Sequence, residues 1–208
     1  MARRTKEDAL ETRDQILDAA EHVFQRRGVS RTSLQEIAAE AGLSRGAIYW
    51  HFQNKADVFE AMMQRVKLPM VANFNSQPEA EAADPLQHLR RNVATAFHQT
   101  VHDEQMRRVF EIASHKVEYV DELQALRARH ISERGECLGD LNRMLTLAVG
   151  RGQLAASLSV QGAAVGLHSL IDGLMHNWLL NPQSFDLEVV GSAALDTYIA
   201  GLAATSTR

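Results

Sequence analysis

The chain has 208 residues, of which 45% are hydrophobic, and its formal net charge at neutral pH is −4. This length and apolar content suffice for one large or two modest domains with a buried core, and the charge excludes a uniformly basic nucleic-acid binder. The single cysteine, Cys137, excludes an internal disulfide framework, so we expect a reducing, cytoplasmic location. No apolar signal segment follows the N-terminus and no apolar run looks long enough to span a bilayer, so we expect neither secretion nor membrane insertion.

The charge differs between the two ends of the chain. Residues 1–67 carry 11 Lys and Arg against 10 Asp and Glu, whereas residues 68–208 carry 11 against 16. A near-neutral N-terminal part on an acidic body is typical of a protein that meets DNA at one end only. The apolar spacing is helical almost throughout and prolines are few, which predicts an all-α fold of about nine helices.

The N-terminal segment predicts a polar arm followed by one long helix. Residues 1–8 contain Arg3, Arg4 and Lys6, and such an arm either reaches a DNA groove or is a solvated terminus. Residues 9–27 repeat apolar side chains at helical spacing, and Gly28 ends the helix.

Residues 32–55 predict two short helices joined by a tight turn. Thr32 or Ser33 caps the first helix, with Gln35 or Glu36 completing a capping box. Gly42 ends that helix, and Ser44 caps a second one from Arg45 to about Phe52. This arrangement is a helix-turn-helix, in which the second helix enters a DNA major groove.

The second helix carries polar residues without an evident packing role. Arg45 suits guanine edges or phosphate, and Gly46 allows close approach to another surface. The predicted DNA contacts are Thr32, Ser33, Gln35, Ser44, Arg45, Gly46, Tyr49, His51 and Lys55. In the alternative interpretation, Tyr49, Trp50, His51 and Phe52 are an aromatic lid on a three-helix core, a role that fits Trp50 and Phe52 better than Tyr49.

The remaining chain predicts a connector helix and a larger helical body. The connector spans 55–73 and should kink or end near Pro69, and a loose acidic loop covers 75–84. Helices follow at about 84–103, 104–114, 120–151, 160–180 and 186–204. The helix 160–180 is apolar nearly all round, which predicts that a second copy of the chain covers part of it.

Residues 10–60 resemble the DNA-binding domain of the TetR family of bacterial transcriptional repressors. The resemblance rests on TRDQILDAA, F-x-x-R-G, T-S-L-x-E-I-A, A-G-L-S-R-G-A-I-Y-W-H-F and N-K, which occur in the family's order. Similarity in HKVEYVDEL and GLMHNWLLNPQSFDL extends to the AcrR branch, whose members repress multidrug efflux pump genes. The resemblance implies residues 1–55 as DNA-binding domain, residues 74–208 as effector-binding and dimerisation domain, and a homodimer built from the last two helices.

The same resemblance places an effector cavity in the body. We expect an apolar or aromatic small molecule there that releases the protein from inverted-repeat operator DNA. The candidate lining residues are Lys67, Asn92, Ala96, Phe110, Ser114, Cys137, Leu141, His168, Ile171, Asp172, Met175 and His176. The candidate dimer contacts are Leu167, Leu174, Trp178, Leu195, Tyr198 and Ile199.

Other functional classes fit the sequence less well. His98 and His102 are spaced to share a helix face, but no H-E-x-x-H motif, cysteine pair or carboxylate triad accompanies them, so we expect no metal. No phosphate loop or nucleophile context is present, so we expect neither enzyme activity nor a cofactor. The open alternatives are a helical DNA-binding dimer without an effector and a regulator of a metabolic rather than an efflux operon.

Overall fold

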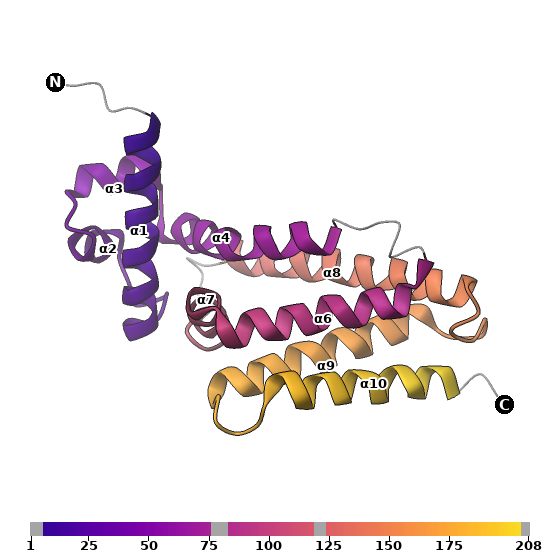
Figure 1. Ribbon diagram of the computed structural model, residues 1–208. Helices are drawn as coiled ribbons and strands as arrows, with labels where there is room; N and C mark the ends of the chain where they lie inside the picture. Colours follow the sequence, from indigo (N-terminus) through magenta and orange to yellow (C-terminus); the bar gives the residue numbers. More distant parts are fainter. Residues whose placement is uncertain (1–5, 76–82, 119–123, 205–208) are drawn as a thin grey trace. The chain divides into compact units, whose positions relative to one another are not determined.

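The computed structural model describes residues 6–75, 83–118 and 124–204, which form nine α-helices and no strand (Figure 1). The helices are α1 (Lys6–Arg27), α2 (Leu34–Glu40), α3 (Arg45–His51), α4 (Lys55–Asn75), α6 (Pro85–His102), α7 (Glu104–His115), α8 (Gln124–Gly150), α9 (Val160–Leu180) and α10 (Leu187–Ala204). The all-α fold expected from the sequence is confirmed. Parts of the predicted basic arm, of the loop after residue 75 and of the helix start at Val120 lie outside the described residues.

The chain divides into two compact units. The N-terminal unit contains Met1–Leu68 and Arg108–Ala128, and the C-terminal unit contains Pro69–Arg107 and Arg129–Arg208. These limits differ from the sequence-based boundaries, because residues 108–128 group with the N-terminal helices. One backbone link that holds them there is the hydrogen bond from Val29 N to the Lys116 carbonyl, at 2.9 Å.

The core of the N-terminal unit forms behind α2 and α3. Its most buried side chains are Ile16, Leu17, Val23, Phe24, Val29, Ile37, Ile48, Val58, Met62, Val109 and Ile112. Glu21 of α1 is 1% exposed, and its carboxylate accepts hydrogen bonds from Arg65 of α4 and Arg108 of α7. Although burial opposes the charge of Arg65, the bond and attraction to Glu21 raise its pKa above the usual value. The buried ion pairs therefore fasten three helices together.

Pro69 does not end α4. The helix runs without interruption to Asn75, two residues beyond the predicted end at residue 73. Proline removes one backbone hydrogen bond, at a cost of about 3 kcal/mol, and a helix of 21 residues retains many others. Of the two outcomes expected near Pro69, a kink or an end, the end is therefore wrong.

The C-terminal unit is built on α6, α9 and α10, which lie side by side (Figure 1). Gly191 of α10 meets the ring of Phe97 of α6, and a Cβ at this glycine would overlap the ring. Arg90 donates to Asp196 at 2.7 Å across the same pair of helices. The Tyr198 hydroxyl donates to the Ala163 carbonyl at 2.9 Å and joins α10 to α9. Close packing and polar links therefore fix the positions of these helices.

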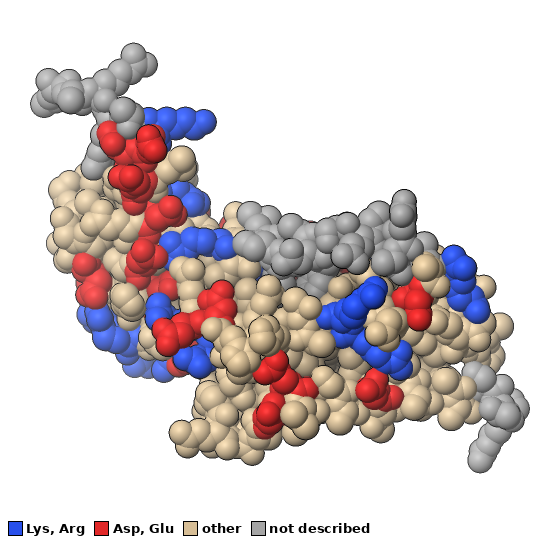
Figure 2. All heavy atoms as spheres, in the orientation of Figure 1, with Lys and Arg blue, Asp and Glu red and all other residues tan. Residues whose placement is uncertain are grey.

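Helix α10 is long and apolar enough to cross a membrane by length and composition alone. The expectation that no apolar run has that length was therefore too strict. Only 22% of its residues are buried within the single chain, and the core helices of soluble proteins pass the same test. Figure 2 shows that charged side chains are sparse on the visible part of α9 and α10. A helix of this kind needs a cover, and a second protein chain can provide it.

Candidate nucleic-acid interface and effector site

Local hydrogen bonds define both ends of α2. The Ser33 hydroxyl accepts from the Glu36 backbone N–H at 3.3 Å, and the Glu36 carboxylate accepts from the Ser33 backbone N–H at 2.9 Å. This is the capping box that the sequence predicts. Gly42 follows the helix with a φ of +67°, the left-handed conformation that favours glycine at a helix end. The bond from Leu43 N to the Ala38 carbonyl, at 2.8 Å, closes the turn.

Helix α3 begins at the predicted cap and is held by one buried side chain. The Ser44 hydroxyl accepts from the Ala47 backbone N–H at 3.3 Å. Ile48 is fully buried and packs α3 on the core of the N-terminal unit. The Asn54 side-chain oxygen then accepts a hydrogen bond from the Asp57 backbone N–H at 3.0 Å and caps α4. The chain therefore forms a helix-turn-helix that presents one side of α3 to solvent.

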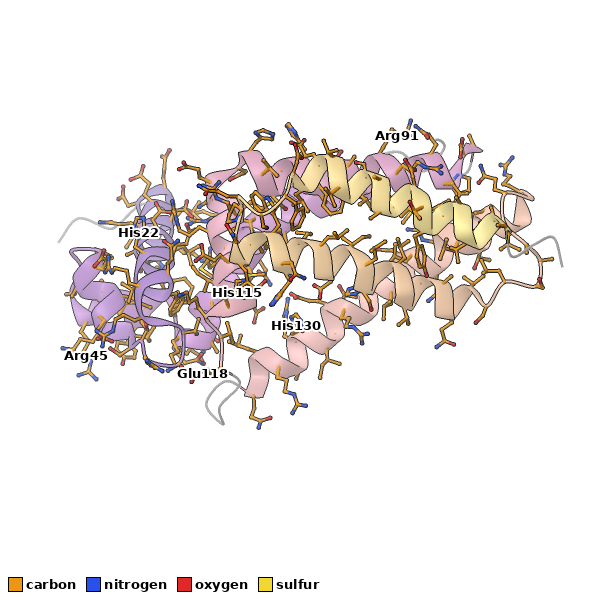
Figure 3. All side chains as sticks on the ribbon, turned by 90° about the horizontal axis from the view of Figure 1, so that it is seen from below. His22, Arg45, Arg91, His115, Glu118 and His130 are labelled. Atoms are coloured by element: carbon orange, nitrogen blue, oxygen red, sulfur yellow. The ribbon has the colours of Figure 1, made fainter. Side chains whose placement is uncertain are left out.

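The exposed side of α3 carries Arg45, Gly46, Tyr49 and Trp50. Tyr49 is 47% exposed and Trp50 is 72% exposed. The Arg45 guanidinium lies 5.4 Å from the centre of the Tyr49 ring and extends outward from the helix (Figure 3). A Cβ added to Gly46 would meet only the Ser44 hydroxyl oxygen, at 3.9 Å. Nothing within the described residues therefore requires a glycine at this position, whereas close approach to an external surface does.

The nine predicted DNA contacts fall into two groups. Ser33, Gln35, Ser44, Arg45, Gly46 and Tyr49 are exposed, and His51 is half-buried. Thr32 is 3% exposed and its hydroxyl donates to the Gly28 carbonyl at 2.8 Å. Lys55 is 7% exposed and its ammonium donates to the Ser30 carbonyl at 2.6 Å. These two residues hold the loop between α1 and α2, which leaves them little surface for contact with DNA.

Trp50 departs from the aromatic-lid interpretation. Phe52 is buried at 4% exposure, as that interpretation expects, but Trp50 faces solvent. At about 100° per residue, Trp50 lies roughly 200° around the helix from Ile48, so the two cannot share a face. This spacing could have predicted from the sequence that Trp50 is exposed. Trp50 is therefore added to the candidate interface.

The predicted effector residues are divided between the two units. Lys67, Phe110 and Ser114 belong to the N-terminal unit, and the other nine belong to the C-terminal unit. Ala96, Phe110 and Leu141 are buried, Lys67, Asn92, His168, Ile171 and Met175 are half-buried, and Ser114, Cys137, Asp172 and His176 are exposed.

His168 of α9 lies in a charged environment. Burial lowers the pKa of its imidazole, Asp172 opposes that shift, and Arg134 and His130 of α8 add to it. Figure 3 shows His130 on the side of α8 that faces α9. His168 and Asp172, both among the predicted effector residues, therefore interact within α9. This arrangement fits an internal pair of His168 with Asp172 and equally fits contact of the two side chains with a ligand.

A polar row on α6 was not fully predicted. His88 is 3% exposed, and among the described residues no group lies within hydrogen-bond distance of its Nδ1. The buried side-chain oxygen of Gln99 likewise has no hydrogen-bond partner among the described residues. With Asn92 between them, these residues lie within about 40° around the helix. Polar residues at helical spacing along one face of α6 could have predicted this row. Only Asn92 of the row was proposed from the sequence.

The predicted dimer contacts lie mostly inside the chain. Leu167, Trp178, Leu195 and Ile199 are each 4% exposed or less, and Leu174 and Tyr198 are half-buried. Large apolar side chains are exposed elsewhere on α9 and α10. They are Val165 (39%), Leu180 (62%), Val189 (66%) and Val190 (41%). Leu180, Val189 and Val190, here called the apolar patch, lie at the ends of α9 and α10 that a short loop joins, and they offer surface to a partner. Val165 lies about 22 Å further along α9.

Two family models match the sequence. Residues 16–62 match the model described as bacterial regulatory proteins, tetR family. Residues 84–203 match the C-terminal region of MAATS-type transcriptional repressors. Together they cover both the helix-turn-helix and most of the C-terminal unit.

Individual proteins are similar along nearly the whole chain. The probable HTH-type transcriptional regulator ArpR of Pseudomonas putida is 42% identical over 187 residues, which cover 90% of this chain and 89% of ArpR. The structure of NalD, the secondary repressor of the MexAB-OprM multidrug efflux pump in Pseudomonas aeruginosa, is 34% identical, with a TM-score of 0.86 over 95% of this chain and 98% of NalD. The complex of SmeT with triclosan is 34% identical, with a TM-score of 0.82 over 92% of this chain and 91% of SmeT, the repressor of the Stenotrophomonas maltophilia efflux pump SmeDEF.

Proposed function

The chain belongs to the TetR family of bacterial transcriptional regulators, and we propose that within it this protein is a cytoplasmic, ligand-responsive repressor of an efflux pump operon. NalD and SmeT, to which it is similar along more than nine tenths of its length, are both described as efflux pump repressors. The family consists of transcriptional regulators, which supports a binding function and not an enzymatic one.

The observation that carries this proposal is the exposed face of α3. We assign base reading to Arg45, whose guanidinium offers the paired donors that guanine edges accept. Gly46 lets the helix backbone approach the groove wall, and Ser44 and Tyr49 donate to phosphates, which fixes position without reading sequence. Trp50 extends the same surface.

Two copies of the chain are needed for a full binding site. One short helix contacts only a few base pairs, whereas a two-fold dimer reads an inverted repeat whose half-sites lie about 34 Å apart or a multiple of that distance. The apolar patch on α9 and α10 supports a dimer, because exposed apolar groups of this size on two adjacent helices are costly in water. The low burial of α10 in the single chain points the same way.

The effector is proposed to be an apolar aromatic molecule with one hydrogen-bonding group. The buried polar row on α6 supports this class, because the Nδ1 of His88 and the side-chain oxygen of Gln99 lack partners among the described residues. A ligand hydroxyl would satisfy one of them. The complex of SmeT with triclosan, a phenol, supports the same chemistry. Such a ligand releases DNA only if it binds the DNA-incompetent state more tightly.

The first experiment selects the preferred site from random duplex DNA and measures binding by fluorescence anisotropy. We expect an inverted repeat that is bound at least about 10³-fold more tightly than random DNA. Arg45→Ala should relax the preference at one base position in each half-site, whereas Tyr49→Phe should weaken binding to all sequences alike. Triclosan, added to the complex, should raise the Kd for the repeat.

The outcomes separate the parts of the proposal. Equal affinity for all sequences, with a steep dependence on salt, would contradict a specific regulator. Specific binding that no apolar or phenolic compound weakens would leave the effector-independent dimer as the function. His88→Phe keeps the site filled but removes its polar atoms, so it should weaken the effect of triclosan while leaving DNA affinity unchanged.

A further inference from the structure

Two histidines and one carboxylate converge where α6 meets α10. His98 and His102 lie one turn apart on α6, and the centres of their rings are 4.3 Å apart. Glu188, in the first turn of α10, lies between them. Its Oε1 is 2.8 Å from Nδ1 of His98, and its Oε2 is 3.0 Å from Nε2 of His102. The sequence suggested no metal because no metal-binding motif or carboxylate triad accompanies these histidines along the chain. Folding supplies one from 86 residues away.

The spacing of these atoms is close to that of a metal site. The three ligand atoms lie within 4.8 Å of one another. In a tetrahedral zinc site, ligands about 2.0–2.1 Å from the metal lie roughly 3.4 Å from each other. The hydrogen-bonded contacts are shorter than this value by about half an ångström, whereas the widest separation, up to 4.8 Å, is longer. The side chains must therefore rotate so that the short contacts open and the wide one closes around an ion.

The two helices that carry the three residues are packed closely together. Phe97, the neighbour of His98, packs directly on Gly191, which lies three residues after Glu188. Arg90 and Asp196 join the same two helices further along. Ligands carried by packed helices keep their positions better than ligands on loops, which favours binding because little order is lost when the ion enters.

The residue types select the ion. Imidazole and carboxylate together suit zinc and other divalent first-row transition metals, whereas magnesium prefers oxygen ligands. Three protein ligands leave a further position for water. The side chains of His98 and His102 are 62% and 56% exposed, so an ion reaches them from solvent. We propose that His98, His102 and Glu188 bind one divalent transition-metal ion per chain, with zinc as the ion the site fits best.

This site is separate from the proposed DNA-reading and effector residues. Its consequence is mechanical, because the ion joins α6 to the first turn of α10 by coordinate bonds in place of two exposed hydrogen bonds. Zinc should therefore stabilise the folded C-terminal unit in a concentration-dependent manner. The competing explanation is a hydrogen-bonded His–Glu–His cluster, which gives the same geometry without affinity for a metal.

The test uses the full chain without an affinity tag, stripped of metal by chelation and titrated with ZnCl₂ by calorimetry. We expect one zinc ion per chain and a rise in Tm with zinc. MgCl₂ should give neither effect. His98→Ala, His102→Ala and Glu188→Gln should each weaken zinc binding at least about tenfold. Glu188→Gln retains the size and hydrogen-bonding capacity of the side chain, so its melting curve without zinc shows whether the fold is intact.

Two controls address other zinc ligands. His22→Ala removes an exposed imidazole of α1, and Cys137→Ser removes the only thiol, so both variants should bind zinc like the unmodified chain. With Co²⁺ in place of zinc, a visible absorption band should appear in the unmodified chain and in these controls, but not in the three site variants. The proposal is overturned if the chain takes up no zinc, or if the three site variants bind it with unchanged stoichiometry and affinity.

Discussion

Gly46 should lower the stability of the fold and at the same time permit close contact with DNA. The variant Gly46→Ala tests the effect on stability and the effect on DNA affinity. An added Cβ would meet only the Ser44 hydroxyl oxygen at 3.9 Å, an ordinary contact, so alanine fits the folded chain. Because glycine in a helix costs about 0.5–1 kcal/mol relative to alanine, the variant should be more stable by that amount in urea unfolding. If the backbone lies against DNA, the methyl group should weaken operator binding by about tenfold or more, or about 1.4 kcal/mol.

A matched control is available on α8. Gly139 is exposed in the middle of that helix, and a Cβ there would have no atom within 4 Å. Gly139→Ala should therefore raise stability by a similar amount and leave DNA affinity, measured by anisotropy, unchanged. Operator binding by Gly46→Ala at the strength of the unmodified chain would refute the close approach of α3 to DNA. A loss of stability in Gly46→Ala would show that a Cβ does not fit at this position without strain.

Further variants test the core, a titrating group and the dimer. Glu21→Gln should lower the free energy of unfolding by about 1–3 kcal/mol in urea titrations, because Arg65 and Arg108 lose the charge of their buried partner while Arg65 keeps Asp18 at 2.8 Å; an unchanged midpoint would contradict this. Burial lowers the pKa of His168 below 6.5, so its contribution to stability is complete above pH 6.5 and falls on acidification, as the unfolded chain takes up the proton first. NMR titration should therefore place its midpoint below 6.5, and a midpoint above that value would be inconsistent with the burial. Val189→Asp should give a folded monomer in sedimentation, and a persistent dimer would exclude the apolar patch as the interface.

Local chemistry made most of the fold predictable. Thr32 or Ser33 was expected to cap α2 because a side-chain oxygen satisfies a free backbone N–H nearby, and Ser33 makes that bond. A helix end at Pro69, one of the two outcomes expected there, was wrong, since a local rule measures the cost of proline but not the stability of the helix around it. The grouping of residues 108–128 with the N-terminal unit depends on contacts such as the bond between Val29 and Lys116, which lie far apart in sequence.

The candidate site was predictable only where exposure follows from a helical period. Tyr49 and Trp50 face solvent at about 100° and 200° around the helix from the buried Ile48, as their spacing requires. Arg45 is also exposed, but it lies only about 60° from Ile48, so its exposure does not follow from the helical period. The burial of Lys55 depends on where the Ser30 carbonyl lies, and no local pattern encodes that position. The same limit hid Glu188, which reaches the histidines of α6 only through the packing of α10.

The central claim is that two identical α3 helices are held at one spacing, and changing the distance between half-sites tests it most directly. Anisotropy titrations would compare the selected inverted repeat with versions lengthened by about five and about ten base pairs, roughly half a turn and one turn of DNA. The half-turn insertion should reduce the affinity of the dimer to that for a single half-site, because the second α3 then faces the wrong side of the duplex. Equal affinity for all spacings would show that the two helices bind independently, which would contradict a fixed spacing between them.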